Sequence, residues 1–314
     1  MTRISLGRIR QAAAAIDPVF LGSPQYECEP LSHALGARLQ LKVEVLNPIR
    51  SFKGRGAHWF VAGAPDGELV CATAGNFGQA MAHACRAAGR PLVVFAATSA
   101  NPMKIARMRA LGADVRLDGA NFDEAKAAAK RHCEATGATF VEDGRDPAIT
   151  EGAGTIGLEM SGRGGIDSVV VPLGNGALIS GVGRAVRDLL PGVRVVGVCS
   201  EGADAMHASW RAGRAVSRDE VRTVADGIAV RVPVPEALDD MRDTVDDVVL
   251  VSEESLLESV RLLHAHAGLV TEPAGVAGVA ALLEHPELRT GRPSTIVCGG
   301  NLAPDLGARL LVHG

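Results

Sequence analysis

The sequence has few aromatic residues, no long apolar run and no excess of positive charge. Aromatic residues make up 3% of its 314 positions, although hydrophobic residues make up 47%. A formal net charge of -4 argues against nucleic acid or an anionic membrane as the main partner. No stretch is apolar enough to span a bilayer, and the first ten residues lack the apolar core of a signal peptide. We therefore expect a cytoplasmic protein.

Paired cysteines are also missing. The six cysteines are scattered without a C-x-x-C pair, which argues against a zinc knuckle and against a disulfide framework. We expect these thiols to be reduced. The length, by contrast, is sufficient for about two domains of roughly 150 residues each.

Short β-rich runs alternate with helical segments along the chain. Continuous apolar runs, such as V-V-V-P at 169–172, indicate strands buried on both faces. We expect strands at 39–46, 69–73, 92–97, 114–117, 139–141, 168–171, 193–199, 248–251 and 295–298. This order predicts an α/β fold with mainly parallel sheets. Ligands of such sheets bind at the turns that follow the carboxyl ends of strands.

One lysine has an unusual setting, directly after the expected strand 39–46. The run from Asn47 to Ala57 reads N-P-I-R-S-F-K-G-R-G-A and is centred on Lys53. A lysine beside small residues at a strand end can turn inward, and a desolvated amine is a nucleophile toward aldehydes. Taken alone, a lysine in a glycine-rich turn is more often solvated.

Three glycine-containing turns follow other expected strands. T-A-G-N-F-G-Q at 73–79 precedes a helix, whose N-terminus favours an anion such as a carboxylate. P-L-G-N-G-A-L at 172–178 exposes several N–H groups to a phosphate, but lacks the pattern of a nucleotide P-loop or a dinucleotide fingerprint. T-I-V-C-G-G-N at 295–301 ends a buried strand at Cys298. Each turn alone is compatible with a purely structural role.

Together, an inward lysine, an anion-binding turn, a phosphate-binding turn and a strand-end thiol describe a site for pyridoxal 5'-phosphate. The chain resembles the fold type II pyridoxal-phosphate enzymes, within the threonine/serine dehydratase and serine racemase family. S-F-K-G-R-G-A resembles the family's lysine motif, T-A-G-N-F-G-Q-A its substrate-carboxylate loop, and V-P-L-G-N-G-A-L-I-S-G its tetraglycine phosphate loop. E-G-A-G-T-I-G-L-E, A-D-G-I-A-V, D-D-V-V-L-V and E-P-A-G follow in the family's order.

The resemblance implies an architecture like that of the tryptophan synthase beta chain. Two open, mainly parallel sheets flanked by helices are expected. Residues 1–66 and 146–314 would form a large cofactor-binding domain, and residues 67–145 a small substrate-carboxylate domain. The resemblance also implies a homodimer.

The resemblance also implies a role for each matched site residue. Lys53 would hold the cofactor covalently and later accept the Cα proton of the substrate. Phe52 would pack on the pyridine ring, Asn76 would bond its 3'-oxygen, and Cys298 would face the ring nitrogen. The phosphate would be bound by main-chain amides of Gly174, Asn175, Gly176, Ala177 and Leu178. The substrate carboxylate would be bound by Thr73, Ala74, Gly75, Asn76 and Phe77.

These roles predict dehydration and deamination of a β-hydroxy L-amino acid, threonine and/or serine, to a 2-oxo acid and ammonia. A thiol protonates a pyridine poorly, so a free carbanion is stabilised less and elimination is favoured. Ala74 stands where racemases carry a serine as second acid/base, which disfavours racemisation. A β-replacement enzyme of the cysteine synthase kind remains an alternative interpretation. A non-enzymatic carrier of the cofactor is disfavoured, because the carboxylate loop is present.

Two departures from the family pattern concern cations and substrate choice. Cys199 stands where relatives have a glutamate that helps bind a divalent cation, so we expect no metal. The charged run 142–147 lies where relatives have a loop over the substrate side chain. Its Arg145 could pair with an acidic substrate such as 3-hydroxyaspartate, or form a surface ion pair with its acidic neighbours.

Overall fold

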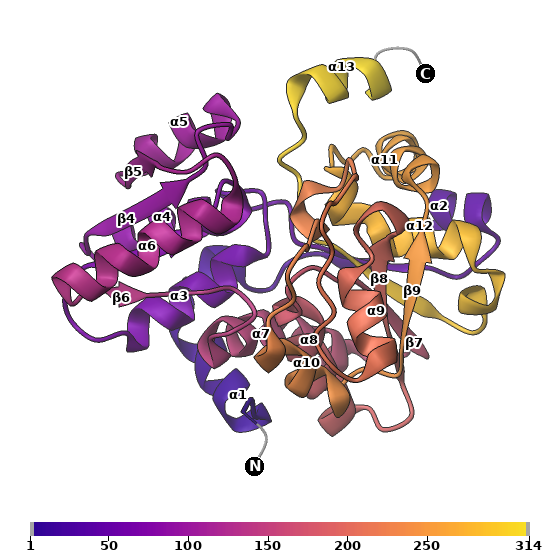
Figure 1. The fold of residues 1–314 in the computed structure, drawn as a ribbon. Coiled ribbons are helices and arrows are strands. Elements are labelled where there is room, and N and C mark those ends of the chain that lie inside the picture. Colours follow the sequence, from indigo (N-terminus) through magenta and orange to yellow (C-terminus); the bar gives the residue numbers. More distant parts are fainter. Residues whose placement is uncertain (1–2, 312–314) are drawn as a thin grey trace.

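The computed structural model describes residues 3–311 and contains two sheets flanked by helices (Figure 1). The larger sheet has the strand order β1-β2-β10-β7-β8-β9, in which only the β1–β2 pair is antiparallel. The smaller sheet has the order β5-β4-β3-β6 and is parallel throughout. The predicted α/β fold with two mainly parallel sheets is confirmed.

The elements have the following bounds. The strands are β1 (Gln25–Glu27), β2 (Gln40–Val43), β3 (Leu69–Ala72), β4 (Leu92–Ala96), β5 (Asp114–Leu117), β6 (Thr139–Phe140), β7 (Ser168–Pro172), β8 (Arg194–Ser200), β9 (Asp247–Val251) and β10 (Pro293–Val297). The helices are α1 (Leu6–Ala15), α2 (Glu29–Leu35), α3 (Lys53–Gly63), α4 (Asn76–Ala87), α5 (Pro102–Ala110), α6 (Phe122–Thr136), α7 (Pro147–Arg163), α8 (Ala177–Leu189), α9 (Ala205–Ala212), α10 (Pro235–Arg242), α11 (Glu253–Ala267), α12 (Ala277–Glu284) and α13 (Pro304–Leu311). Two short 3₁₀ turns, η3 (Asp226–Ile228) and η4 (Pro273–Val276), border the site described below.

Side chains of the larger sheet alternate between two apolar layers. In β7, Val169 and Val171 pack with residues of α7 and α8, whereas Val170 packs with residues of α12. This is the two-residue period of a strand, and helices cover both faces. The continuous apolar runs of the sequence are explained by this double burial.

The smaller sheet is built in the same way. Leu69 and Cys71 of β3 pack with residues of α4, whereas Val70 packs with residues of α6. In Figure 1 this sheet and its helices form the purple and magenta part of the ribbon, beside the larger sheet. Residues at the carboxyl ends of strands from both sheets line a common cavity, which is described below.

Two local expectations differ from the structure. The predicted strand 39–46 is shorter, because β2 ends at Val43 and the chain then turns at Asn47, whose side chain accepts from the N–H groups of Ile49 and Ser51. Lys53 consequently begins helix α3 and does not follow a strand directly, so that part of the prediction was wrong. Strand β1 was not predicted at all, since three residues are too few to show a periodicity.

Candidate active site

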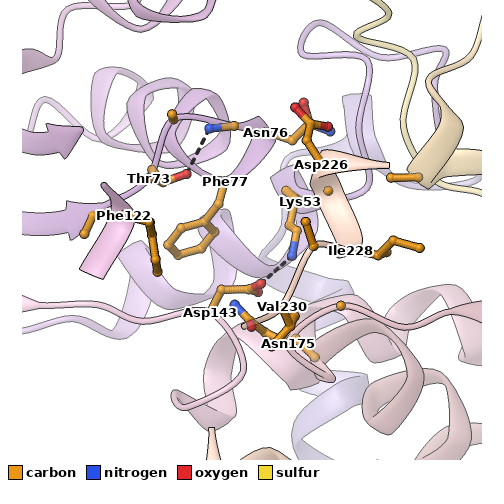
Figure 2. Close-up of a pocket in the computed structure, with 18 of the residues that line it drawn as sticks. Lys53, Thr73, Asn76, Phe77, Phe122, Asp143, Asn175, Asp226, Ile228 and Val230 are labelled. Atoms are coloured by element: carbon orange, nitrogen blue, oxygen red, sulfur yellow. Dashed lines mark hydrogen bonds and ion pairs between the residues drawn. The ribbon is translucent and has the colours of Figure 1, made fainter. Parts of the chain in front are cut away.

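A cavity of about 560 Å³ lies at the carboxyl ends of strands from both sheets (Figure 2). All thirteen residues that we predicted for the site line it. They are Phe52, Lys53, Thr73, Ala74, Gly75, Asn76, Phe77, Gly174, Asn175, Gly176, Ala177, Leu178 and Cys298. The fold therefore brings the lysine, the three turns and the thiol into one place, while their individual roles stay predictions.

The segment before Lys53 is joined to the end of β10 by backbone hydrogen bonds. Phe52 N donates to Cys298 O at 3.1 Å, and Gly300 N donates to Arg50 O at 2.9 Å. Arg50 itself adopts a positive φ of 53°, which is uncommon for a residue other than glycine. These contacts place Lys53 next to the strand-end thiol, although 245 residues separate them in the sequence.

Glycines set the spacing between the helices behind the cavity. A Cβ at Gly152 of α7 would lie 2.6 Å from the carbonyl oxygen of Arg55 in α3. A Cβ at Gly181 of α8 would lie 2.7 Å from the backbone nitrogen of Gly154 in α7. The E-G-A-G-T-I-G-L-E motif therefore lets α7 approach both neighbours closely, which fixes Lys53 relative to the start of α8.

The amine of Lys53 points into the cavity and meets a carboxylate that sequence reasoning missed. Nζ lies 2.6 Å from Oδ2 of Asp143 and 4.7 Å from the ring centroid of Phe52. Asp143 follows β6 by three residues, and both side chains are largely buried. In this charged run the sequence suggests a role only for Arg145. The sequence feature that could have identified Asp143 as a site residue is its position just after an expected parallel strand.

The amide of Asn76 is oriented by two buried partners. Its Nδ2 donates to Oε1 of Glu272 at 2.6 Å, and its Oδ1 accepts from Nδ2 of Asn301 at 2.8 Å. One N–H of the Asn76 amide thus remains for a ligand in the cavity. Burial, and next the charge of Asp226, raise the pKa of Glu272 to about 7, although the hydrogen bond from Asn76 lowers it in part. Glu272 belongs to the E-P-A-G motif, to which we had assigned no role.

Two helix N-termini open onto the cavity. Helix α8 follows Gly176, whose φ of +92° is a glycine conformation, and has no side-chain cap. Helix α4 begins at Asn76, also without a side-chain cap, and a Cβ at Gly75 would meet nothing within 4 Å. The first N–H groups of a helix have no partner within it and attract anions. The cavity is therefore suited to two anionic groups.

The thiol of Cys298 is buried at the end of β10, with Sγ 4.0 Å from Ala274 O. Burial, and next the charge of Glu272, raise the pKa of this thiol to about 12. The thiol is consequently neutral at pH 7. Cys199 is buried as well, with Sγ 3.7 Å from Leu173 O. Within residues 3–311, no group of three or more His, Cys, Asp or Glu side chains is arranged to hold a metal ion.

Arg145 is directed away from the cavity. Its Nε lies 3.4 Å from Oε1 of Glu236, and its Nη1 lies 3.8 Å from Oε2 of Glu142. The side chain is half exposed and is not among the cavity-lining residues. Of the two interpretations that we proposed for Arg145, the surface ion pair is confirmed.

Comparison with known proteins agrees with this arrangement. A family model described as pyridoxal-phosphate dependent enzyme matches residues 16–299. The chain is 37% identical to an L-threonine ammonia-lyase of Thermotoga maritima, over 99% of this chain and 79% of the relative. The structure of a threonine deaminase from T.th. superimposes with a TM-score of 0.90 at 34% identity, covering 95% of this chain and 99% of the other. Maize serine racemase superimposes with a TM-score of 0.91 at 26% identity, covering 96% and 95%. No helix of residues 3–311 has the length and hydropathy to span a membrane.

Proposed function

The chain belongs to the family of pyridoxal-phosphate dependent enzymes, and we propose that it converts L-threonine to a 2-oxo acid and ammonia. The names of the threonine ammonia-lyase and threonine deaminase relatives support this reaction. One structural observation carries the proposal: the amine of Lys53 and two uncapped helix N-termini share one cavity. L-Serine is a second proposed substrate, because it carries the same β-hydroxyl group.

The residues around the cavity fit the cofactor. A Cβ at Gly174 would lie 2.9 Å from the carbonyl oxygen of Gly227, and Gly176 needs its positive φ. The turn from Gly174 to Leu178 is therefore shaped so that main-chain N–H groups can hold the phosphate. We assign Phe52 to one face of the pyridine ring, Asn76 to its 3'-oxygen and Cys298 to its ring nitrogen.

When bound, the cofactor supplies an electrophilic carbon and a ring that withdraws electrons from the substrate Cα. Lys53 is the residue that would hold this group covalently, and its free amine would accept the Cα proton as a general base. The N-terminus of α4 and the segment from Thr73 to Phe77 hold the substrate carboxylate. The neutral thiol of Cys298 gives the ring nitrogen no negative partner and cannot readily protonate it, which favours loss of the β-hydroxyl over a long-lived carbanion.

The cavity walls favour a short uncharged side chain. Phe77 and Val230 contribute apolar surface near Lys53, and Phe122 lines the cavity beyond Phe77, as Figure 2 shows. Arg145, the cation that we considered for an acidic substrate, is engaged by Glu236 and Glu142. We therefore prefer threonine over 3-hydroxyaspartate.

A substrate panel tests the proposal. The purified protein is incubated separately with L-threonine, L-serine, 3-hydroxyaspartate, and O-acetylserine plus sulfide, and 2-oxo acid, ammonia and cysteine are measured. We expect oxo acid and ammonia in equal amounts, fastest from threonine, and none from a Lys53→Ala variant. Cysteine as the main product would replace the lyase proposal by a β-replacement enzyme.

Three further proposals follow from the family resemblance. We propose that the protein acts in the cytoplasm, that it is a homodimer, and that residues 67–145 form a domain separate from 1–66 and 146–314. The smaller sheet, whose strands lie between Leu69 and Phe140, supports the last of these. Sedimentation of the purified protein tests the dimer, and a monomeric mass with cofactor bound would refute it.

A further inference from the structure

Asp143 makes a direct contact with the amine that the proposed reaction uses. Its Oδ2 lies 2.6 Å from Nζ of Lys53, and the two side chains point toward each other in Figure 2. Its Oδ1 is buried and has no hydrogen-bond partner within the described part of the chain. We propose that Asp143 is the counter-ion of the Lys53 nitrogen, a positioning residue that orients the base and stabilises the positive charge it gains.

The loop that carries Asp143 is held by contacts that do not involve Lys53. A Cβ at Gly144, whose φ is +83°, would collide with the carbonyl oxygen of Asn175, so this loop lies directly on the proposed phosphate-binding turn. Oδ2 of Asp146 accepts from Glu142 N at 2.7 Å, and Glu142 also forms an ion pair with Lys126. These contacts fix the carboxylate of Asp143 close to Nζ independently of the ion pair itself.

The other ionisable side chains around the cavity already have partners or are neutral. Lys104 of α5 pairs with Asp226 of η3, Lys126 of α6 pairs with Glu142, and Arg231 pairs with Asp123 of α6. Glu272 is bound by Asn76, and Cys298 is kept neutral by burial. Among these carboxylates, Asp143 is the one that forms an ion pair with Lys53 within the described chain.

A carboxylate in this position helps the lysine at two stages. While Lys53 holds the cofactor, the negative charge of Asp143 favours the protonated form of the linking nitrogen. When the amine of Lys53 takes the Cα proton, the C–H bond breaks, an N–H bond forms, and the new ammonium is already paired. Such a fixed charge acts without reorganisation, as the buried aspartate of a Ser-His-Asp triad does for its histidine. Asp143 itself neither gains nor loses a proton in this step.

A spectroscopic titration tests the inference without relying on turnover. The inference rests on the proposed attachment of the cofactor to Lys53, so the visible absorption of the loaded protein is followed from pH 6 upward. In Asp143→Asn, the midpoint of the absorption change should fall by about one to three pH units relative to the unaltered protein. Asp123→Asn, a carboxylate-to-amide change in the same cavity with Arg231 as its partner, should leave the midpoint in place. In Asp143→Glu, which keeps the charge, the midpoint should lie close to that of the unaltered protein.

Kinetics supply an independent measure. For Asp143→Asn we expect kcat with threonine to fall by about 10²-fold to 10³-fold, with a smaller change in KM, because the lost charge acts on the proton-transfer step. An unchanged absorption midpoint in the loaded Asn variant would overturn the inference, whatever its activity. Asp143→Ser is the second uncharged variant if the Asn variant does not fold. Persistence of the absorption band in Lys53→Ala would instead refute the proposed function, so the two failures are distinguishable.

Discussion

The guanidinium of Arg55 donates two parallel hydrogen bonds to the carboxylate of Glu44, from Nε to Oε2 at 2.8 Å and from Nη2 to Oε1 at 2.8 Å. Both side chains are fully buried, and Nη1 of Arg55 also lies 2.7 Å from Oε1 of Glu159 in α7. Glu44 directly follows β2, and Arg55 follows Lys53 by two residues. This buried cluster therefore ties the first turn of the lysine helix to the larger sheet and to α7.

Removal of this guanidinium should destabilise the fold strongly. In Arg55→Met, the buried carboxylate of Glu44 loses its partner, and we expect the free energy of unfolding to fall by about 3–5 kcal/mol. Denaturant titration measures the loss. Arg38→Met is the matched control, because Arg38 pairs with Glu27 on the surface, where solvent screens the pair, and its loss should change stability little. Equal losses in the two variants would contradict the structural role of the cluster.

The raised pKa of Glu272 predicts a pH-dependent contribution to stability. Burial raises its pKa from 4.5 to about 7, so between these pH values the folded protein binds the proton that the unfolded chain releases. Stability contributed by this group is thus present at low pH and is lost as pH rises toward 7, on the order of 3 kcal/mol in total.

A Glu272→Gln variant isolates this effect. Because the amide does not ionise, its free energy of unfolding relative to the unaltered protein should increase from pH 5 to pH 8. Urea unfolding at each pH gives the difference, and subtraction removes the contribution of other titrating groups. A difference that does not change with pH would mean that Glu272 is not the group responsible.

The methyl group of Ala74 predicts little racemase activity. Racemisation needs a proton donor on the substrate face opposite Lys53, and a methyl group cannot donate one. Ala74→Ser restores a hydroxyl at this cavity-lining position and should raise D-serine formation from L-serine, while pyruvate release continues. Chiral chromatography of the products measures both. If the unaltered protein already forms D-serine as fast as pyruvate, our account of position 74 is wrong.

Two ion pairs between cavity-lining residues join the proposed small domain to the rest of the chain. Asp123 of α6 accepts from Nε of Arg231 at 3.0 Å, and Lys104 of α5 pairs with Asp226. Both pairs link residues 67–145 to the segment that includes η3. A loop that binds substrate on a separate body gains its contacts by moving.

Loss of the Arg231 pair should therefore weaken closure. Arg231→Gln should raise KM for threonine up to about fivefold with little change in kcat, since a partly exposed pair contributes at most about 1 kcal/mol. Arg222→Gln, which breaks an exposed pair with Glu220, should leave KM unchanged and serves as the control. Identical domain orientations with and without a substrate analogue would argue against closure.

Local patterns were sufficient to predict much of this protein. Apolar runs such as V-V-V-P predicted strands buried on both faces, because successive side chains of a strand point to opposite faces of the sheet and all of these are apolar. Gly176 and its neighbours predicted an anion-binding turn, because a positive φ and open N–H groups are local properties of the backbone. The order of the motifs along the chain predicted the family and the cofactor.

Tertiary structure alone decided which distant charges meet. Asp143 contacts Lys53 from 90 residues away, and Arg55 reaches Glu159 from 104 residues away. Neither contact leaves a periodic signal, since ion pairing depends on the positions of whole helices and loops. The partner of Arg145 could not be predicted from the sequence either, because Glu236 lies on α10. This contact places Arg145 in a surface ion pair and not at the substrate. The positions of these helices and loops are set by close backbone contacts at residues such as Gly152 and by the packing of helices on each sheet.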